Sequence, residues 1–309
     1  MRGTSLVDVI EATRPGAAQR TVNVEGQALS VVVPAFNEEG AVRNTIQDIE
    51  AALKPLGIPF EIIVVDDGST DATAAEARRT SARVLANGVN SGYGASLKRG
   101  VKEAVHDYVA IIDADGTYPP HYLPAMLEMA RGADMIVGDR GAAMRNVPLI
   151  RRPAKFLLNS LANFLAQRKI NDLNSGLRVF RREELVPFLP LLPANFSFTT
   201  TITLCMMCYG KRVVYTPIEY GRRIGSSKIR PMDFFNFILL VVRITTLFNP
   251  LRVFLPLGGI LFVLGWLKLA YDITQWNLSE TAVFAFLASI MVWSLGLIAD
   301  MISRLHLRP

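Results

Sequence analysis

Short apolar runs alternate with helix-like stretches over the first half of the chain. The apolar runs are LSVVVP, FEIIVVDDG, ARVLANG, YVAIIDADG and ADMIVG, and the helix-like stretches between them are 41–56, 70–79, 93–104 and 122–130. Strands that alternate with helices predict parallel βαβ units. Residues 62–65 form a β-branched run and 108–112 are nearly as apolar, which is typical of strands covered by helices on both faces. The pattern therefore predicts an α/β, Rossmann-like domain.

The pattern becomes less regular after residue 140. It indicates a basic helix over 151–168, a strand over 177–180, a helix over 199–209 and a strand over 212–218. We interpret this part as the second half of the same domain, which would bind a second substrate that acts as the acceptor.

The C-terminal part is strongly apolar. Residues 231–249 carry only Asp233 and Arg243 as charges, and we predict a helix that lies on the bilayer surface. Residues 253–273 and 281–302 each reach the length of about 20 residues that crosses a membrane, which predicts two transmembrane helices. The link 272–280 has two acids and no Lys or Arg, whereas basic residues flank the outer ends. This asymmetry places both termini in the cytoplasm.

Composition adds a positive charge to this picture. The chain has a net charge of +6, which suits nucleic acid, anionic lipid or a phosphate-rich substrate. Its arginines do not alternate with aromatic residues, and this disfavours a nucleic-acid partner. The two cysteines, Cys205 and Cys208, lie in an apolar run without a second pair, which favours buried thiols over a metal or redox site.

Polar residues gather where three of the predicted strands end. They form PAFNE at 34–38, DDGSTD at 66–71 and DADGT at 113–117. In open α/β sheets ligands bind beyond the carboxyl ends of the strands, so we expect one shared site. Asp113 and Asp115 should point the same way because side-chain direction repeats every second residue. They suit one Mg²⁺ or Mn²⁺ ion that takes its other ligands from a diphosphate and stabilises its departure.

The first two polar clusters contain groups that could hold a nucleotide. Pro34 and Ala35 supply an apolar floor, and Asn37 and Glu38 supply an amide and a carboxylate. A helix cap is the alternative for Asn37 or Glu38. Asp66 could accept a hydrogen bond from a ribose or a base.

Together these motifs resemble the inverting family-two glycosyltransferases of the GT-A fold, and specifically their dolichyl-phosphate mannose synthase branch, from about Leu29 to Lys228. The resemblance also implies that residues 90–94 lie beside the base of a nucleotide-sugar donor and that a loop at 225–228 closes near this donor. The expected donor-binding set is Pro34, Ala35, Asn37, Glu38, Asp66, Asn90, Gly92, Gly94, Asp113, Ala114, Arg223 and Lys228. It implies that Asp113 and Asp115 bind the metal. Many relatives have a glutamine where this chain has Thr117, whose hydroxyl is a candidate third ligand.

An acceptor such as a polyprenyl phosphate must be recognised by cations, because the phosphate is its only polar group. The expected acceptor-phosphate residues are Arg140, Arg151, Arg152, Lys155 and Ser175. A solvated basic surface is the alternative for Arg151, Arg152 and Lys155. Arg178 matches the family's D-x-x-S-G-x-R element and resembles a phosphate clamp. Asp172 in that element is expected to orient groups, since a phosphate is already ionised near neutrality and needs no base.

The resemblance implies one in-line displacement with inversion, in which Asp115, Asp172 and Arg178 form the catalytic set. A single hexose would pass from a GDP-mannose or UDP-glucose type of donor to dolichyl or undecaprenyl phosphate. A processive polysaccharide synthase is an alternative, but Gln167 and Arg168 lack the tryptophan of Q-x-x-R-W. A non-catalytic nucleotide-binding membrane adaptor is another. A dinucleotide oxidoreductase is disfavoured because PAFNEEG is not G-x-G-x-x-G.

The patterns and the resemblance divide the chain into five expected segments. They are an N-terminal tail (1–27), a cytosolic GT-A catalytic domain (28–230), an interfacial amphipathic helix (231–250), a transmembrane hairpin (251–303) and a cytosolic tail (304–309). The tail at 1–27 has no apolar core and predicts neither a signal peptide nor an anchor. We expect a multi-pass protein of the cell membrane. Whether it forms a homo-oligomer through the hairpin is left open by the sequence.

Overall fold

The computed structural model describes residues 22–141, 170–194, 197–221, 239, 242, 246, 249–276 and 279–306. The chain divides into two units. The larger one, called here the α/β unit, contains the predicted strands, and the second contains the two long C-terminal helices. The expected helix 151–168 and most of the expected helix 231–249 lie outside the described residues.

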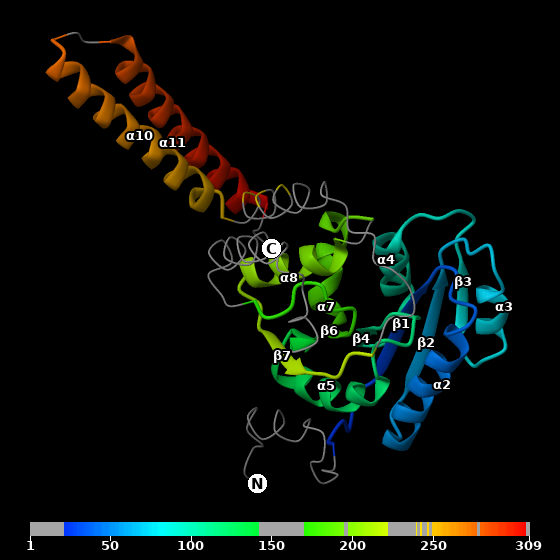
Figure 1. Cartoon of the computed structure of the whole chain (residues 1–309). Helices are drawn as coiled ribbons and strands as arrows, with labels where there is room; N and C mark the ends of the chain where they lie inside the picture. Colours follow the sequence, from blue (N-terminus) through cyan, green and yellow to red (C-terminus); the bar gives the residue numbers. More distant parts are fainter. Residues whose placement is uncertain are drawn as a thin grey trace, which may run out of the picture. The chain divides into compact units, whose positions relative to one another are not determined.

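The α/β unit is built on a seven-stranded mixed sheet of order β3-β2-β1-β4-β6-β5-β7 (Figure 1). The strands are β1 (Leu29–Ala35), β2 (Phe60–Asp66), β3 (Arg83–Ala86), β4 (Tyr108–Ile111), β5 (Met135–Asp139), β6 (Arg178–Arg181) and β7 (Val213–Pro217). The pairs β1–β2, β1–β4, β2–β3 and β5–β7 are parallel, whereas β6 is antiparallel to both of its neighbours. The predicted α/β, Rossmann-like fold is thus confirmed.

The position of β6 differs from a simple βαβ series. Arg178 pairs with Ile111 of β4 on one side and with Val137 of β5 on the other. The alternation of strands and helices would have placed β5 directly beside β4. A four-residue strand carries almost no local signal for its neighbours, so its pairing is decided by tertiary contacts. As a result the start of β6 lies at the carboxyl ends of β4 and β5.

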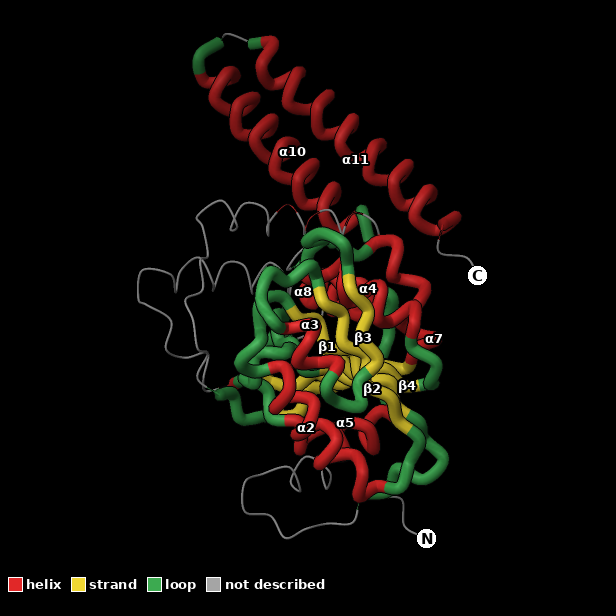
Figure 2. Tube along the Cα trace, turned by 90° about the vertical axis from the view of Figure 1, so that its right-hand side faces the viewer, coloured by secondary structure: helices red, strands yellow, loops and turns green. Residues whose placement is uncertain are grey.

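Helices cover both faces of this sheet (Figure 2). The helices of the α/β unit are α2 (Val42–Leu53), α3 (Thr73–Arg78), α4 (Tyr93–Glu103), α5 (Leu123–Met129), α7 (Arg182–Leu185) and α8 (Phe198–Cys208). Helix α2 buries one stripe of residues at helical spacing, Val42, Ile46, Ile49 and Leu53, in a core shared with α5 and β1. Helix α4 packs on the opposite face, where Gly100 lies against Val32 and Val65. All seven residues of β1 are buried, which explains its unbroken apolar sequence.

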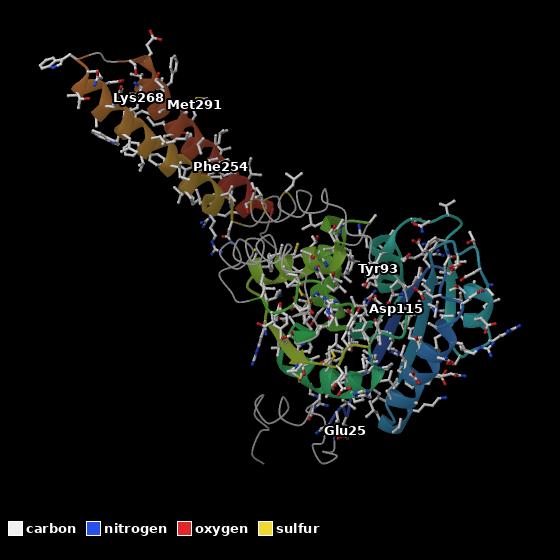
Figure 3. All side chains as sticks on the ribbon, in the orientation of Figure 1. Glu25, Tyr93, Asp115, Phe254, Lys268 and Met291 are labelled. Atoms are coloured by element: carbon white, nitrogen blue, oxygen red, sulfur yellow. The ribbon has the colours of Figure 1, made fainter. Side chains whose placement is uncertain are left out.

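The second unit is a hairpin of α10 (Leu251–Thr274) and α11 (Glu280–His306) (Figure 3). Both helices are long and apolar enough to cross a membrane, as the sequence predicts. Small residues let them pack closely: a Cβ on Gly258 would lie 2.3 Å from the indole nitrogen of Trp293. At the turn Asp272 pairs with Lys268 and accepts a hydrogen bond of 3.0 Å from the backbone N–H of Ser279. This contact ties the start of α11 to the end of α10.

Candidate active site at the carboxyl edge of the sheet

The loops that follow β1, β2 and β3 meet at one edge of the sheet. Ala35 and Asp66, the last residues of β1 and β2, are register partners. The N–H of Asp67 donates to the carbonyl of Ala35 (2.8 Å), and the N–H of Asn87 donates to the carbonyl of Asp66 (2.8 Å). The parallel pairing therefore brings the PAFNE and DDGSTD sequences and the loop after β3 together.

Asn37 joins two of these loops. Its backbone has a φ of 57°, in the left-handed region that Asn tolerates better than most residues. Its side-chain oxygen accepts a hydrogen bond from the N–H of Thr70 (2.9 Å), and its own N–H donates to Ser69 Oγ (2.9 Å). The Asn37 side chain and backbone thus hold the two loops together, and its expected contact with a nucleoside stays a prediction.

Asp67 is a functional candidate that the sequence reasoning missed. Its buried carboxylate accepts hydrogen bonds from the N–H groups of Ser91 (2.9 Å) and Gly92 (2.8 Å) and from the Asn87 amide (2.8 Å). Gly68 completes the contact, since a Cβ there would lie 2.8 Å from the backbone of Val89. Residues 87–92, called here the nucleotide loop after the role that the resemblance predicts for Asn90 and Gly92, are therefore fixed to the end of β2. The signal in the sequence was the second aspartate of the D-D-G sequence at 66–68.

Asp113 is held between two elements that are distant in sequence. The hydroxyl of Tyr93, at the start of α4, donates to Asp113 Oδ1 (2.8 Å). A Cβ on Gly176 would lie 2.3 Å from Asp113 Oδ2, so any other residue there would displace the Asp113 carboxylate. Burial, together with the charge of Asp113, raises the pKa of Tyr93 well above its ordinary value. The phenol therefore stays protonated and acts as a donor to the carboxylate.

Asp115 and Thr117 form a short turn beside it (Figure 3 labels Tyr93 and Asp115). Thr117 donates to Asp115 Oδ1 from its hydroxyl (2.6 Å) and from its N–H (3.1 Å). In the part of the chain that the structure describes, no group of three or more His, Cys, Asp or Glu residues is placed to hold a metal. Two carboxylates and a hydroxyl fit an Mg²⁺ or Mn²⁺ ion that completes its shell with substrate phosphates.

Arg140 and Asp172 form a buried, two-pronged ion pair. Arg140 Nε donates to Asp172 Oδ2 (2.7 Å) and Nη2 donates to Oδ1 (2.8 Å), with the side chains only 10% and 3% exposed. Burial alone would raise the pKa of the Asp172 carboxyl, but the hydrogen bonds and the charge of Arg140 outweigh it and hold the pKa below its usual value. Arg140 also stacks on the ring of Tyr220 at 5.3 Å. Asp172 is thus a fixed carboxylate that orients Arg140.

Arg178 occupies a different environment from the one expected of a phosphate clamp. Its side chain is completely buried, and its guanidinium donates to the carbonyls of Ser175 (2.8 Å) and Leu173 (2.9 Å). A third hydrogen bond of 2.6 Å reaches the hydroxyl of Thr203 in α8. Ser175 is fully buried as well. Both side chains are therefore buried and shape the 172–178 loop from inside, and their expected contacts with substrate phosphate stay predictions.

The remaining expected residues fall into three groups. The buried ones are Pro34, Ala35, Asp66, Gly94 and Ala114, and the partly or fully exposed ones are Asn37, Glu38, Asn90, Gly92, Asp113 and Asp115. Arg151, Arg152, Lys155, Arg223 and Lys228 lie outside the described residues. The described part of the site therefore contains ten of the twelve expected donor-binding residues and the Arg140–Asp172 pair.

Two family profiles match the sequence. That of the Glycosyl transferase family 2 matches residues 30–185, and that of the GtrB C-terminal hairpin matches residues 249–305. The chain is 28% identical over 302 residues to the undecaprenyl-phosphate 4-deoxy-4-formamido-L-arabinose transferase of Edwardsiella ictaluri, covering 91% of this chain and 90% of the relative. It is 30% identical over 205 residues to the dolichyl-phosphate hexose transferase of Haloferax volcanii, covering 66% of this chain and 87% of the relative.

Solved structures share the fold at low sequence identity. One is mannosyl-3-phosphoglycerate synthase from Rubrobacter xylanophilus, with a TM-score of 0.55, 23% identity, and coverage of 77% of this chain and 75% of that one. Another is glucosyl-3-phosphoglycerate synthase from Mycobacterium tuberculosis in complex with Mn²⁺, UDP-glucose and glycerol 3-phosphate, with a TM-score of 0.53, 23% identity, and coverage of 79% and 86%.

Proposed function

Because the chain belongs to glycosyl transferase family 2, we propose that it transfers a single sugar from a nucleotide-diphosphate donor to a polyprenyl phosphate at a membrane. The observation that carries the proposal is the meeting of three features at one sheet edge. They are the D-A-D carboxylates, the nucleotide loop fixed by Asp67, and the Arg140–Asp172 pair. The names of the relatives support the acceptor class, since both are transferases acting on a polyprenyl phosphate.

The donor side would bind the nucleotide through residues already placed for it. Asp67 holds the nucleotide loop, and Asp66 lies at the end of β2 next to that loop. Asp113, Asp115 and Thr117 would hold Mg²⁺ or Mn²⁺, which when bound stabilises the departing diphosphate as a Lewis acid. The solved relative crystallised with Mn²⁺ and UDP-glucose supports this choice of ion. The donor we propose is a hexose of the GDP-mannose or UDP-glucose type.

The acceptor side would rely on Arg140. Asp172 accepts two of its hydrogen bonds and so fixes the direction of the guanidinium. A phosphate acceptor is already ionised near neutral pH, with a second pKa of about 6, and needs no general base. This agrees with an Asp172 pKa that is lowered, because such a carboxylate is a poor base. A direct attack of phosphate oxygen on the anomeric carbon, with inversion, follows from this division of roles.

The hairpin α10–α11 would bring the enzyme to its lipid substrate. Both helices carry large apolar side chains that are exposed in the structure, among them Leu264, Trp266, Leu267, Ile290 and Leu297. Such a surface suits lipid tails. We propose a multi-pass position in the cell membrane with the α/β unit and both termini in the cytoplasm, as the charges around the hairpin predict.

The test is transfer by the purified full-length chain in lipid nanodiscs. UDP- and GDP-sugars would be offered one by one with undecaprenyl or dolichyl phosphate and Mn²⁺, and the product analysed by mass spectrometry and by NMR for its anomeric configuration. Asp115→Asn should lower the rate at least about 100-fold, because metal assistance is worth several kcal/mol. Asp48→Asn, an exposed change on α2, is the control. No transfer from any donor by the wild type, or full activity in Asp115→Asn, would refute the proposal.

A further inference from the structure

Tyr93 reaches into the site from an element that the proposed reaction does not otherwise use. It is the first residue of α4, and its hydroxyl lies 2.8 Å from Asp113 Oδ1. In the sequence it stands between Gly92 and Gly94, in the stretch that the resemblance places beside the base. A phenol that donates to a carboxylate of the D-A-D sequence is placed to fix the orientation of that carboxylate.

The place of Tyr93 is set by a helix that is anchored at several points. Just before Tyr93, the N–H of Gly92 donates to Asp67 Oδ2 (2.8 Å). Just after it, the N–H of Ala95 donates to the carbonyl of Ala194 (2.9 Å). Further along α4, a Cβ on Gly100 would lie 2.3 Å from Val32, so the helix rests directly on β1. The hydroxyl of Tyr93 is therefore carried by a rigid element.

Asp113 needs such a partner because the terminal torsion of a carboxylate is soft. Rotation about χ2 of aspartate is broad, so a carboxylate held from one side only samples several orientations. Gly176 limits Asp113 on the Oδ2 side, and Tyr93 bonds to Oδ1. The same tyrosine follows directly on the nucleotide loop, so the contact would link that loop to the carboxylate proposed to lie beside the donor diphosphate.

We propose that Tyr93 is a positioning residue for the donor cation: its hydroxyl orients Asp113 and couples the nucleotide loop to the metal-binding carboxylates. The inference rests on the proposed function, since it needs a donor that brings a diphosphate and a cation. Loss of a hydrogen bond to a metal-ligating group lowers metal affinity about 10- to 100-fold. We therefore expect Tyr93→Phe to weaken Mn²⁺ binding by about that factor.

The experiment measures Mn²⁺ binding directly, without turnover. Wild type, Tyr93→Phe and Tyr108→Phe, all as full-length chains in nanodiscs, would be titrated with Mn²⁺ in the presence of UDP and of GDP, with free Mn²⁺ read by EPR. Tyr108 is the matched control. It is a half-buried tyrosine at the amino-terminal end of β4, whereas the candidate site lies beyond the carboxyl ends of the strands. Nucleotide affinity without metal, measured by calorimetry, should be the same in all three proteins. If Tyr93 served only the fold, Tyr93→Phe would not weaken Mn²⁺ binding while leaving nucleotide affinity without metal unchanged.

A double-mutant cycle tests whether Tyr93 acts through Asp113. In an Asp113→Asn background the further change Tyr93→Phe should cost less than threefold in Mn²⁺ affinity, because the carboxylate that it orients is gone. Equal Mn²⁺ affinity in wild type and Tyr93→Phe would overturn the inference, and so would loss of folding in Tyr93→Phe, since the hydroxyl would then serve stability. If the wild type binds no Mn²⁺ with either nucleotide, the cation role in the proposed function fails with it.

Discussion

Replacement of Arg178 by lysine separates two roles for this residue. A phosphate clamp would show its effect in acceptor binding, whereas the buried position predicts an effect on stability. Arg178 donates to two backbone carbonyls, those of Leu173 and Ser175, and to the hydroxyl of Thr203. Arg178 meets these three acceptors with three different nitrogens, whereas the three N–H donors of lysine sit on one nitrogen, so we expect lysine to reach about one of them.

The size of the effect follows from the groups that lose their donor. Two buried acceptors left unsatisfied cost about 1–3 kcal/mol each, so Arg178→Lys should lower the free energy of unfolding by about 2–6 kcal/mol. For a domain of this size about 4 kcal/mol corresponds to a fall in Tm of about 8–16 °C. Arg181→Lys is the matched control at the other end of β6, where the guanidinium contacts are partly exposed. We expect it to cost less than about 1.5 kcal/mol.

The assay is thermal unfolding of the full-length chain in nanodiscs, together with KM for polyprenyl phosphate in the surviving folded fraction. The structural role predicts a large fall in Tm and a KM within about threefold of the wild type. An unchanged Tm with a KM raised tenfold or more would show that Arg178 meets the acceptor, and the reasoning from its burial would be refuted.

Two further predictions concern the 172–178 loop. Asp172→Asn should cost about 3–5 kcal/mol because it leaves Arg140 buried without its carboxylate. Because the folded pKa of Asp172 is lowered, its carboxylate contributes fully to stability above the ordinary value of about 3.9, and the contribution is lost as the pH falls through the lower folded pKa. The difference in free energy of unfolding between the wild type and Asp172→Asn should therefore shrink as the pH falls below about 3.9, and a difference in urea unfolding that stays constant there would contradict the pairing. Gly176→Ala should cost about 1–3 kcal/mol and weaken Mn²⁺ binding about tenfold, because its Cβ would displace Asp113; Gly132→Ala, which has open space around its Cβ, should change neither in chemical denaturation or EPR titration.

The sequence predicted the elements of the fold well because each has a strong local pattern. The β-branched run in β2 and the helical spacing of apolar residues in α2 are both set by nearest neighbours in the chain. The two apolar helices ended within a few residues of their predicted limits. The antiparallel insertion of β6 was not predictable in this way, because a four-residue strand is placed by its partners and not by its own composition.

The site was predictable in its residue types and less so in its contacts. D-A-D and D-D-G-S-T-D marked the correct strand ends, since parallel topology brings those ends together. The role of Asp67 and the contact between Tyr93 and Asp113 depend on side-chain directions across segments that are 20 or more residues apart, for which the sequence has no periodic signal. Arg178 shows the same limit, because a family motif marks a residue as needed without saying whether it faces solvent or the interior.

The reversed direction of β6 has a consequence for how such an enzyme can diversify. The chain leaves β5 at Asp139 and enters β6 at Arg178, and both points lie at the edge that carries the D-A-D carboxylates. The segment that connects them therefore starts and ends at this edge, and its described part brings Asp172 and Gly176 to the site. If the proposed function is right, substitutions in this one continuous stretch of gene would alter the groups on the acceptor side, while strands β1 to β3 and their loops would stay as they are.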